Sequence, residues 1–125
     1  MQPLSLADIF GASAIQDGTT LTITKADLPG LTPTMNNRAE QLLVGILERL
    51  RSRIRGNITS PTGLTLTSPA GSPITFDQSK YYERLDCLYW RVNFRAGQRI
   101  DQLIVHCYIT PPLAPGTVIA PSQFE

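Results

Sequence analysis

The sequence predicts a single α+β domain, in which one long amphipathic helix packs on antiparallel β-strands and hairpins between extended N- and C-terminal arms. Three observations predict it: an apolar stripe with helical spacing over residues 35–55, alternating apolar residues on both sides of residues 96–99, and a proline-rich end. A chain of 125 residues has the usual size of one domain. We divide it into an N-terminal arm (1–18), an α+β core (19–110) and a Pro-rich C-terminal arm (111–125).

Composition places the chain among globular proteins and gives it little overall attraction for polyanions. Hydrophobic residues make up 42% and charged residues 17%, the latter below the roughly 25% that is typical. The net charge of +1 favours neither nucleic acid nor a membrane surface. The start of the chain lacks the pattern of a signal peptide, and the longest apolar run, residues 42–47, is far shorter than the roughly 20 residues of a membrane span. We therefore expect a chain made and folded in a cytoplasm, without a membrane segment.

The long helix is predicted by apolar residues that fall on one side of a helical wheel. At 100° per residue they form a stripe about 140° wide, which suits a helix laid on a core. Thr32 before Pro33 is typical of a helix start, and Gly56-Asn57 is typical of a stop, so the helix should run to Arg55. The stripe consists of Met35, Ala39, Leu42, Leu43, Ile46, Leu47, Leu50 and Ile54.

Shorter elements are expected on both sides of this helix. Residues 19–24 alternate and predict a strand. The pattern Thr-Ser-Pro-x-Gly occurs at 59–63, which we interpret as a loop, and again at 67–71, which favours the type I turn of a hairpin. Asp77 is expected to cap a short helix over residues 78–85. The hairpin arms should turn four apolar side chains inward: Leu64, Leu66, Ile74 and Phe76.

The strongest strand pair flanks residues 96–99. A four-residue loop there would give three apolar pairs on one face of the hairpin. Residues 111–125 contain four prolines and cannot form a helix or a central strand, so this C-terminal arm should be extended. The predicted cross-strand pairs are Val92 with Leu103, Trp90 with Val105 and Leu88 with Cys107.

The two cysteines and the lone histidine form no recognisable catalytic or metal-binding pattern. In the register above, Cys87 and Cys107 face opposite sides, and without a secretion signal we expect two free thiols acting as small core residues. A three-residue loop would instead bring them face to face. His106 lies mid-strand on the more polar face, which is typical of a surface or interface histidine. We expect no metal, cofactor or small-molecule substrate, and an enzyme is the least favoured hypothesis.

The strongest candidate for partner binding is the cluster of four arginines at the end of the helix. On the wheel they lie at the edges of the apolar stripe, with Arg53 within it, so the last turn should leave the core and project. One or two cations would complement the helix C-terminus, and Glu48 can pair with Arg51. Four predict an acidic partner surface, protein or phosphate, and protein is favoured because no aromatic residue lies among them to stack on bases. The four are Arg49, Arg51, Arg53 and Arg55.

Other candidate partner contacts come from aromatic residues and from the C-terminal arm. The aromatic residues concentrated in ten positions are Tyr81, Tyr82, Tyr89 and Trp90. They are typical either of core and edge positions or of an interface anchor, since Tyr, Trp and Arg are enriched at the centres of protein interfaces. The arm offers Pro111, Pro112 and Phe124.

Residues 6–12 (LADIFGA), 20–28 (TLTITKADL) and 31–34 (LTPT) resemble the start of small uncharacterised proteins from cyanobacteria and their phages. The resemblance ends with residues 42–47 and carries no active-site residue. It implies a phage-related setting, in which small α+β proteins with extended arms commonly act as virion subunits.

From these observations we expect a non-catalytic structural subunit of a homo- or hetero-oligomeric assembly. The favoured setting is a phage particle (neck, tail, baseplate or capsid-associated), so the chain would be found in the virion or the host cytoplasm. Its partners would be protein neighbours, joined by the arms and the arginine-rich helix end. The alternative is a small nucleic-acid-binding protein that uses residues 49–55 and whose binding weakens steeply with salt.

Overall fold

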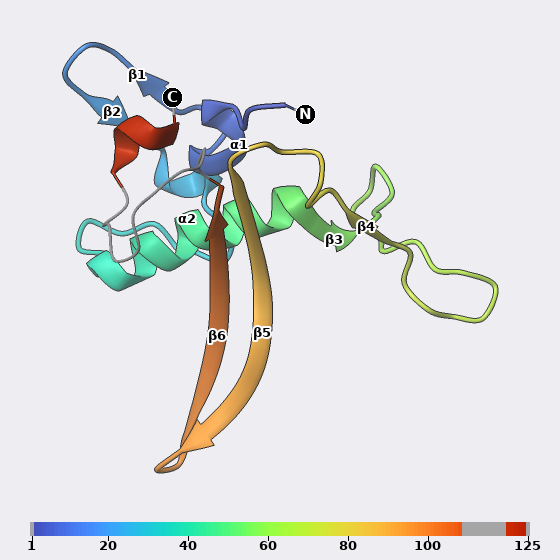
Figure 1. Ribbon diagram of the computed structural model, residues 1–125. Coiled ribbons are helices and arrows are strands. Elements are labelled where there is room, and N and C mark those ends of the chain that lie inside the picture. Colours follow the sequence, from blue (N-terminus) through green and yellow to red (C-terminus); the bar gives the residue numbers. More distant parts are fainter. Residues whose placement is uncertain (1, 109–119, 125) are drawn as a thin grey trace.

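The computed structural model describes residues 2–108 and 120–124, and it has the predicted α+β architecture (Figure 1). Within these described residues the strands form three separate antiparallel pairs, β1–β2, β3–β4 and β5–β6. The elements are α1 (Leu6–Phe10), β1 (Ile15–Gln16), β2 (Leu21–Thr22), the 3₁₀ helix η1 (Lys25–Asp27), α2 (Ala39–Ile54), β3 (Arg55–Asn57), β4 (Thr75–Asp77), β5 (Leu85–Arg95), β6 (Gln98–Cys107) and the 3₁₀ helix η2 (Pro121–Phe124).

The long helix α2 begins later than the sequence predicts. Met35 lies outside it and is 96% exposed, although it belongs to the predicted stripe. The backbone N–H of Thr34 donates to the Asn37 side chain at 2.9 Å, and the Asn37 amide donates to the Thr32 carbonyl at 3.0 Å. Because these side-chain bonds hold residues 32–37 in a turn, the helix cannot start there and begins at Ala39.

The helix ends within one residue of the predicted position, but by a different device. After Ile54 the chain passes directly into the extended strand β3, which pairs with β4. Gly56 lies opposite Phe76, and a Cβ at this glycine would be 3.1 Å from the Phe76 ring. Gly56 therefore makes room for an aromatic ring and does not act as a left-handed helix cap.

The hydrophobic core is small and lies against the second half of α2. Its buried members are Leu50, Ile54, Tyr82 and Cys87. Leu28 forms a second buried contact against Gly45, where a Cβ would come within 3.1 Å of the Leu28 Cβ. The predicted stripe is therefore only partly covered, and Leu43 on its first half is 57% exposed.

The N-terminal segment is not an extended arm in the structure, because α1 packs on α2 of the same chain (Figure 1). Ser5 and Asp8 cap this short helix reciprocally: the Asp8 N–H donates to the Ser5 hydroxyl at 3.1 Å, and the Ser5 N–H donates to the Asp8 carboxylate at 2.8 Å. The predicted strand over 19–24 shortens to β2, which pairs with β1.

Residues 58–74 form two similar turns where the sequence suggested one. The N–H of Gly63 donates to Ser60 O and that of Gly71 donates to Ser68 O, each at 2.9 Å. The second turn is as predicted, but the first is also a turn closed by a strand bridge and not an open loop. The inward orientation is wrong for three of the four apolar side chains, because this region extends away from α2 (Figure 1). Leu64 is 70% exposed, Leu66 41% and Ile74 39%.

The short helix predicted over residues 78–85 is absent, and these residues form turns before β5 begins at Leu85. Backbone groups of these residues are hydrogen-bonded to the backbone of Gln2 instead of to each other. The Gln2 N–H donates to Tyr81 O at 2.9 Å, and the Gln2 carbonyl accepts from the Glu83 N–H at 3.2 Å. Pairing with the N-terminal segment thus competes successfully with helix formation.

The β5–β6 hairpin forms, but in a register different from the predicted one. Arg95 pairs with Gln98, so only Ala96 and Gly97 form the loop, with φ of 50° and 78°. Such two-residue turns match the twist of the flanking strands, and this decides the register. Val92 consequently lies opposite Asp101 and not Leu103, and a β-bulge separates it from Tyr89.

The new register also changes the placement of the cysteines. Cys87 pairs with Val105 and Cys107 with Leu85, so the two cysteines share one face of the hairpin. Both are free thiols, as expected. The expectation of two core residues holds for Cys87, which is fully buried, and is wrong for Cys107, which is exposed because it lies at the end of β6.

The C-terminal arm is described only in part. Residues 120–124 include η2, so the expectation of an extended chain is wrong for Pro121–Phe124. Proline suits the first position of a helix because its φ is already fixed near the helical value. Pro111 and Pro112 lie outside the described residues.

Candidate functional site

Arg49, the first of the four arginines, is used within the chain. Its Nε donates to the carbonyl of Ala7 at 2.9 Å, and its Nη1 donates to that of Asp27 at 3.3 Å. The Arg49 side chain thereby connects α2 to two earlier segments of the chain, α1 and η1.

Arg51 forms the predicted pair with Glu48. Its Nε lies 3.1 Å from both carboxylate oxygens of Glu48, and its guanidinium lies 4.6 Å from the ring centre of Tyr89. The Tyr89 hydroxyl also donates to Glu48. Burial works to raise the pKa of Glu48, but the hydrogen bonds from Arg51 and Tyr89 outweigh it, so the pKa of this carboxyl lies below its usual value. The three side chains form a charge-balanced cluster between α2 and β5.

Arg53 and Arg55 hold the end of α2 to two distant segments. Arg53 Nε lies 2.7 Å from Oδ1 of Asp8 on α1. Arg55 donates to both carboxylate oxygens of Asp86 and to the carbonyl of Cys87 at 3.0 Å. Asp86 is buried, with only 3% of its surface exposed. Its Nε also lies 3.5 Å from Asp77.

The expectation that the last turn leaves the core is therefore wrong. Ile54 is fully buried between these arginines, and each guanidinium has an acceptor within the chain. Their acidic partners Asp8 and Asp86 lie 45 and 31 residues away in the sequence, a separation at which no local pattern signals a contact. Binding of an external acidic surface by these arginines stays a prediction, and the exposed half of Arg53 is the part most open to it.

The other predicted contact residues also separate in the structure. Tyr82 is a core residue, only 6% exposed, and is not a surface anchor because α2 covers it. Tyr81 is 47% exposed, stacks edge-on against Tyr82 with ring centres 5.1 Å apart, and donates its hydroxyl to Gln2. Phe124 is partly buried at the end of η2.

Sequence reasoning singled out Tyr89 and Trp90 as possible interface anchors, but it missed the rest of the exposed surface on the outer part of the β5–β6 hairpin. The hairpin passes α2 and extends beyond it (Figure 1). Its exposed large apolar residues are Tyr89, Trp90, Val92, Phe94, Ile100 and Val105. Of these, Trp90, Val92 and Phe94 alternate with polar residues, and this pattern suggested a buried face.

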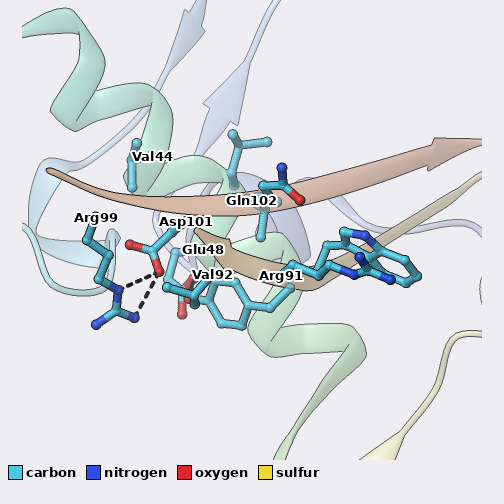
Figure 2. Close-up of a pocket in the computed structure, with 11 residues that line it drawn as sticks. Val44, Glu48, Arg91, Val92, Arg99, Asp101 and Gln102 are labelled. Carbon is cyan, nitrogen blue, oxygen red and sulfur yellow. Dashed lines mark hydrogen bonds and ion pairs between the residues drawn. The ribbon is translucent and has the colours of Figure 1, made fainter. Parts of the chain in front are cut away.

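A groove of about 810 Å³ lies between α2 and the concave side of this hairpin (Figure 2). Val44 on α2, 61% exposed, and Val92 on β5, 48% exposed, are among its lining side chains. Arg99 and Asp101 on β6 also line it and pair with each other at 3.0 Å (Figure 2). The acidic groups of the groove thus have partners within the chain, and the remaining lining combines apolar side chains with Arg91 and Gln102.

Groups capable of catalysis are sparse in the part of the chain that the structure describes. His106 is a surface residue, as predicted, and its Nδ1 lies 3.6 Å from Asp86 Oδ2. Within residues 2–108 and 120–124, no three His, Cys, Asp or Glu side chains gather as metal ligands would. None of the helices described is long and apolar enough to cross a membrane.

Comparison of the chain with protein-family models, with curated proteins and with solved structures finds no match. The candidate site is therefore described from the structure alone. It is a largely apolar groove between α2 and the β5–β6 hairpin, and the outer half of this hairpin is exposed on both faces. The resemblance to proteins of cyanobacteria and their phages stays a prediction.

Proposed function

We propose that this chain is a non-catalytic structural subunit of an oligomeric assembly, joined to its neighbours by the β5–β6 hairpin. The observation that supports this most strongly is the exposed apolar surface of that hairpin, where Phe94 is 76% exposed, Trp90 56% and Tyr89 55%. Large contiguous apolar patches on soluble proteins usually mark binding surfaces, and aromatic residues are typical of interface centres.

The hairpin has further reason to need a neighbour. Among the described residues, β5 and β6 have no third strand beside them, so each has an open edge. A two-stranded ribbon is marginally stable in water without packing against another element, and open edges readily pair with other chains. A neighbour would supply the missing contacts.

The resemblance of the first third of the sequence supports a phage particle as the setting, with a place in the neck, tail or baseplate or at the capsid. The alternative of nucleic-acid binding through residues 49–55 loses its main support, because those arginines have acceptors within the chain. Dedicated phosphate-binding arginines would present their guanidinium groups to solvent.

The test is the native mass of the purified chain by light scattering over a wide concentration range, combined with hydrogen exchange of the β5–β6 amides. We expect a mass above 13.7 kDa and hairpin amides that are protected only in the assembled state. A chain that stays monomeric at the highest concentration, yet protects these amides fully, would overturn the proposal, because its hairpin would then need no neighbour.

A further inference from the structure

We propose that one side of the β5–β6 hairpin binds single-stranded nucleic acid, with Arg91 and Arg95 on phosphate groups and the Trp90 ring stacked on a base. The inference goes beyond the proposed function, because it adds a partner of another kind. It leaves the face of the hairpin that carries Phe94 for protein neighbours.

The β-bulge of β5 brings the three side chains together. It places two residues, Trp90 and Arg91, opposite the single residue Gln102. Arg91 and Arg95 are four residues apart on the strand and therefore share a face, whereas Phe94 lies on the opposite one. The guanidinium of Arg91 lies over the Trp90 ring, 5.8 Å from its centre. A cation and an exposed aromatic surface thus stand side by side.

The charges of Arg91 and Arg95 are not used inside the chain. Within the part of the chain that the structure describes, both side chains are exposed, and neither has a carboxylate or carbonyl acceptor. Figure 2 shows Arg91 pointing away from Asp101, the carboxylate that Arg99 binds. Arginines that bind phosphate must present their guanidinium groups to solvent, and these two do so. The arginines that do have an acceptor are Arg38, Arg49, Arg51, Arg53, Arg55, Arg84 and Arg99.

The rest of this face is neutral. Asn93 lies between the two arginines, and Gln98, Ile100 and Gln102 stand opposite on β6. From Trp90 outward, the described face therefore carries two positive charges and no Asp or Glu. The side-chain amides can both donate to and accept from the edges of unpaired bases.

The spacing of the two cations favours a polyanion. Four residues of β-strand place the Cα atoms of Arg91 and Arg95 about 13 Å apart. A ligand that meets both extended side chains carries anionic groups spaced along its length, as a nucleic-acid strand does.

The exposed ring of Trp90 favours a single strand over a duplex or an acidic peptide. The residue is 56% exposed, so one side of the indole is open to a flat partner. An unpaired base offers such a surface, whereas the bases of a duplex are stacked on each other and an acidic peptide has none. Cations interleaved with aromatic rings are the combination by which proteins bind single strands.

The first experiment measures the fluorescence anisotropy of a labelled oligothymidylate of about 16 nucleotides at about 50 mM salt. We expect the parent chain to bind it, and Arg91→Ala with Arg95→Ala to weaken binding by about 10-fold or more. Raising the salt roughly fourfold should weaken the parent's binding about sevenfold, as expected for two phosphate contacts on a single strand. The matched control is Arg38→Ala with Lys80→Ala, which removes two exposed charges elsewhere and should leave the affinity within about twofold.

The second experiment uses Trp90, the only tryptophan of the chain, as its own reporter. The oligonucleotide should quench its fluorescence through stacking, whereas a polyglutamate of equal charge should not. Trp90→Ala should weaken oligonucleotide binding about fivefold or more. Circular dichroism of all variants should match the parent chain, because the substituted side chains are exposed.

The outcomes are decisive for this inference. Absence of binding at low salt, or binding that Arg91→Ala with Arg95→Ala leaves unchanged, would overturn it. Equal quenching by polyglutamate would identify an acidic protein as the partner, and equal affinity for a duplex would exclude stacking on Trp90; either result overturns the single strand. A chain that assembles but binds no oligonucleotide keeps its structural role, whereas a monomer with a protected hairpin that binds it loses that role and keeps this inference.

Discussion

Arg55 at the end of α2 and Asp86 at the start of β5 form a two-pronged ion pair, with Arg55 Nη2 3.1 Å from Asp86 Oδ2 and Nη1 on the other carboxylate oxygen. Asp86 is only 3% exposed, so this pair lies beside the core and not on the outer surface. It fixes the direction in which the β5–β6 hairpin leaves the body. The base of the exposed hairpin is thus held by Arg55, an arginine that the sequence analysis predicted to bind an external partner.

Removing either member of this pair should destabilise the chain, because it leaves a partly buried charge without its partner. We expect Arg55→Ala and Asp86→Ala each to lower the free energy of unfolding by about 2–3 kcal/mol, as for hydrogen bonds to charged groups. Urea unfolding measures this, and a double-mutant cycle isolates the coupling. Arg38→Ala is the control, because the Arg38–Glu40 pair is highly exposed and should contribute less than about 1 kcal/mol. Equal effects of the two arginine variants would contradict this role for Arg55.

Acidification should loosen the contact between α1 and α2 through Asp8. Burial works to raise the pKa of Asp8, but hydrogen bonds from Ser5 and the contact with Arg53 outweigh it and hold the pKa below the ordinary value of 3.8. The stabilisation is therefore complete above pH 3.8 and is lost as the pH falls through the lower folded pKa. The stability advantage of the parent chain over Asp8→Asn, followed by thermal unfolding, should shrink across this range. An advantage that stays constant with pH would contradict the assignment.

The carboxyl of Asp17 should titrate unusually low. Hydrogen bonds from the backbone N–H groups of Thr19 and Thr20, with help from their hydroxyls, lower its pKa to about 2. A carbon-detected NMR titration of the Asp17 side chain should give this value. Thr20→Val removes one hydroxyl donor and keeps the backbone donor, so the pKa should rise but stay below 3.8. A midpoint at the ordinary value in the parent chain would mean that the β1–β2 turn is not formed.

Substitution at the tip of the hairpin should raise stability. Ala96 has a φ of 50°, a left-handed conformation that costs an alanine about 1–2 kcal/mol. Asn-Gly is strongly favoured in two-residue turns of this kind, so Ala96→Asn should gain about 0.5–1 kcal/mol in urea unfolding. Gly97→Ala, at a φ of 78°, should lose a similar amount or more. If Ala96→Asn is neutral and Gly97→Ala harmless, the loop is not this turn.

The two thiols should differ sharply in reactivity. Cys107 is exposed, whereas Cys87 is fully buried, and burial together with the nearby Asp86 raises the pKa of the Cys87 thiol. In the reduced chain, a thiol reagent should modify Cys107 at once and Cys87 at least about 100-fold more slowly, since Cys87 must wait for local opening. Mass spectrometry of the modified peptides gives both rates. Similar rates would show that the root of the hairpin is open.

The sequence predicted the types of helix and strand more reliably than the contacts between them. The apolar spacing of residues 42–54 predicts a helix because it is a local property of the backbone. Its end was predicted to within one residue from Gly56-Asn57, although pairing of β3 with β4 is what ends it. The Glu48–Arg51 pair follows for the same reason, since residues three apart are neighbours on a helix. The start of the helix did not follow, because the turn held by Asn37 depends on side-chain hydrogen bonds that spacing does not reveal.

The candidate site was decided almost entirely by tertiary structure. The arginines were recognisable as a cluster, but their acceptors Asp8 and Asp86 come from distant parts of the chain and only folding brings them together. The exposure of the hairpin face could not be predicted from the sequence, because alternating apolar residues are expected both in a buried strand and in an exposed one. Local chemistry thus determined that this chain forms a helix and hairpins, whereas long-range contacts decided which charges are satisfied inside it and which apolar side chains, Phe94 and Val44 above all, stay exposed.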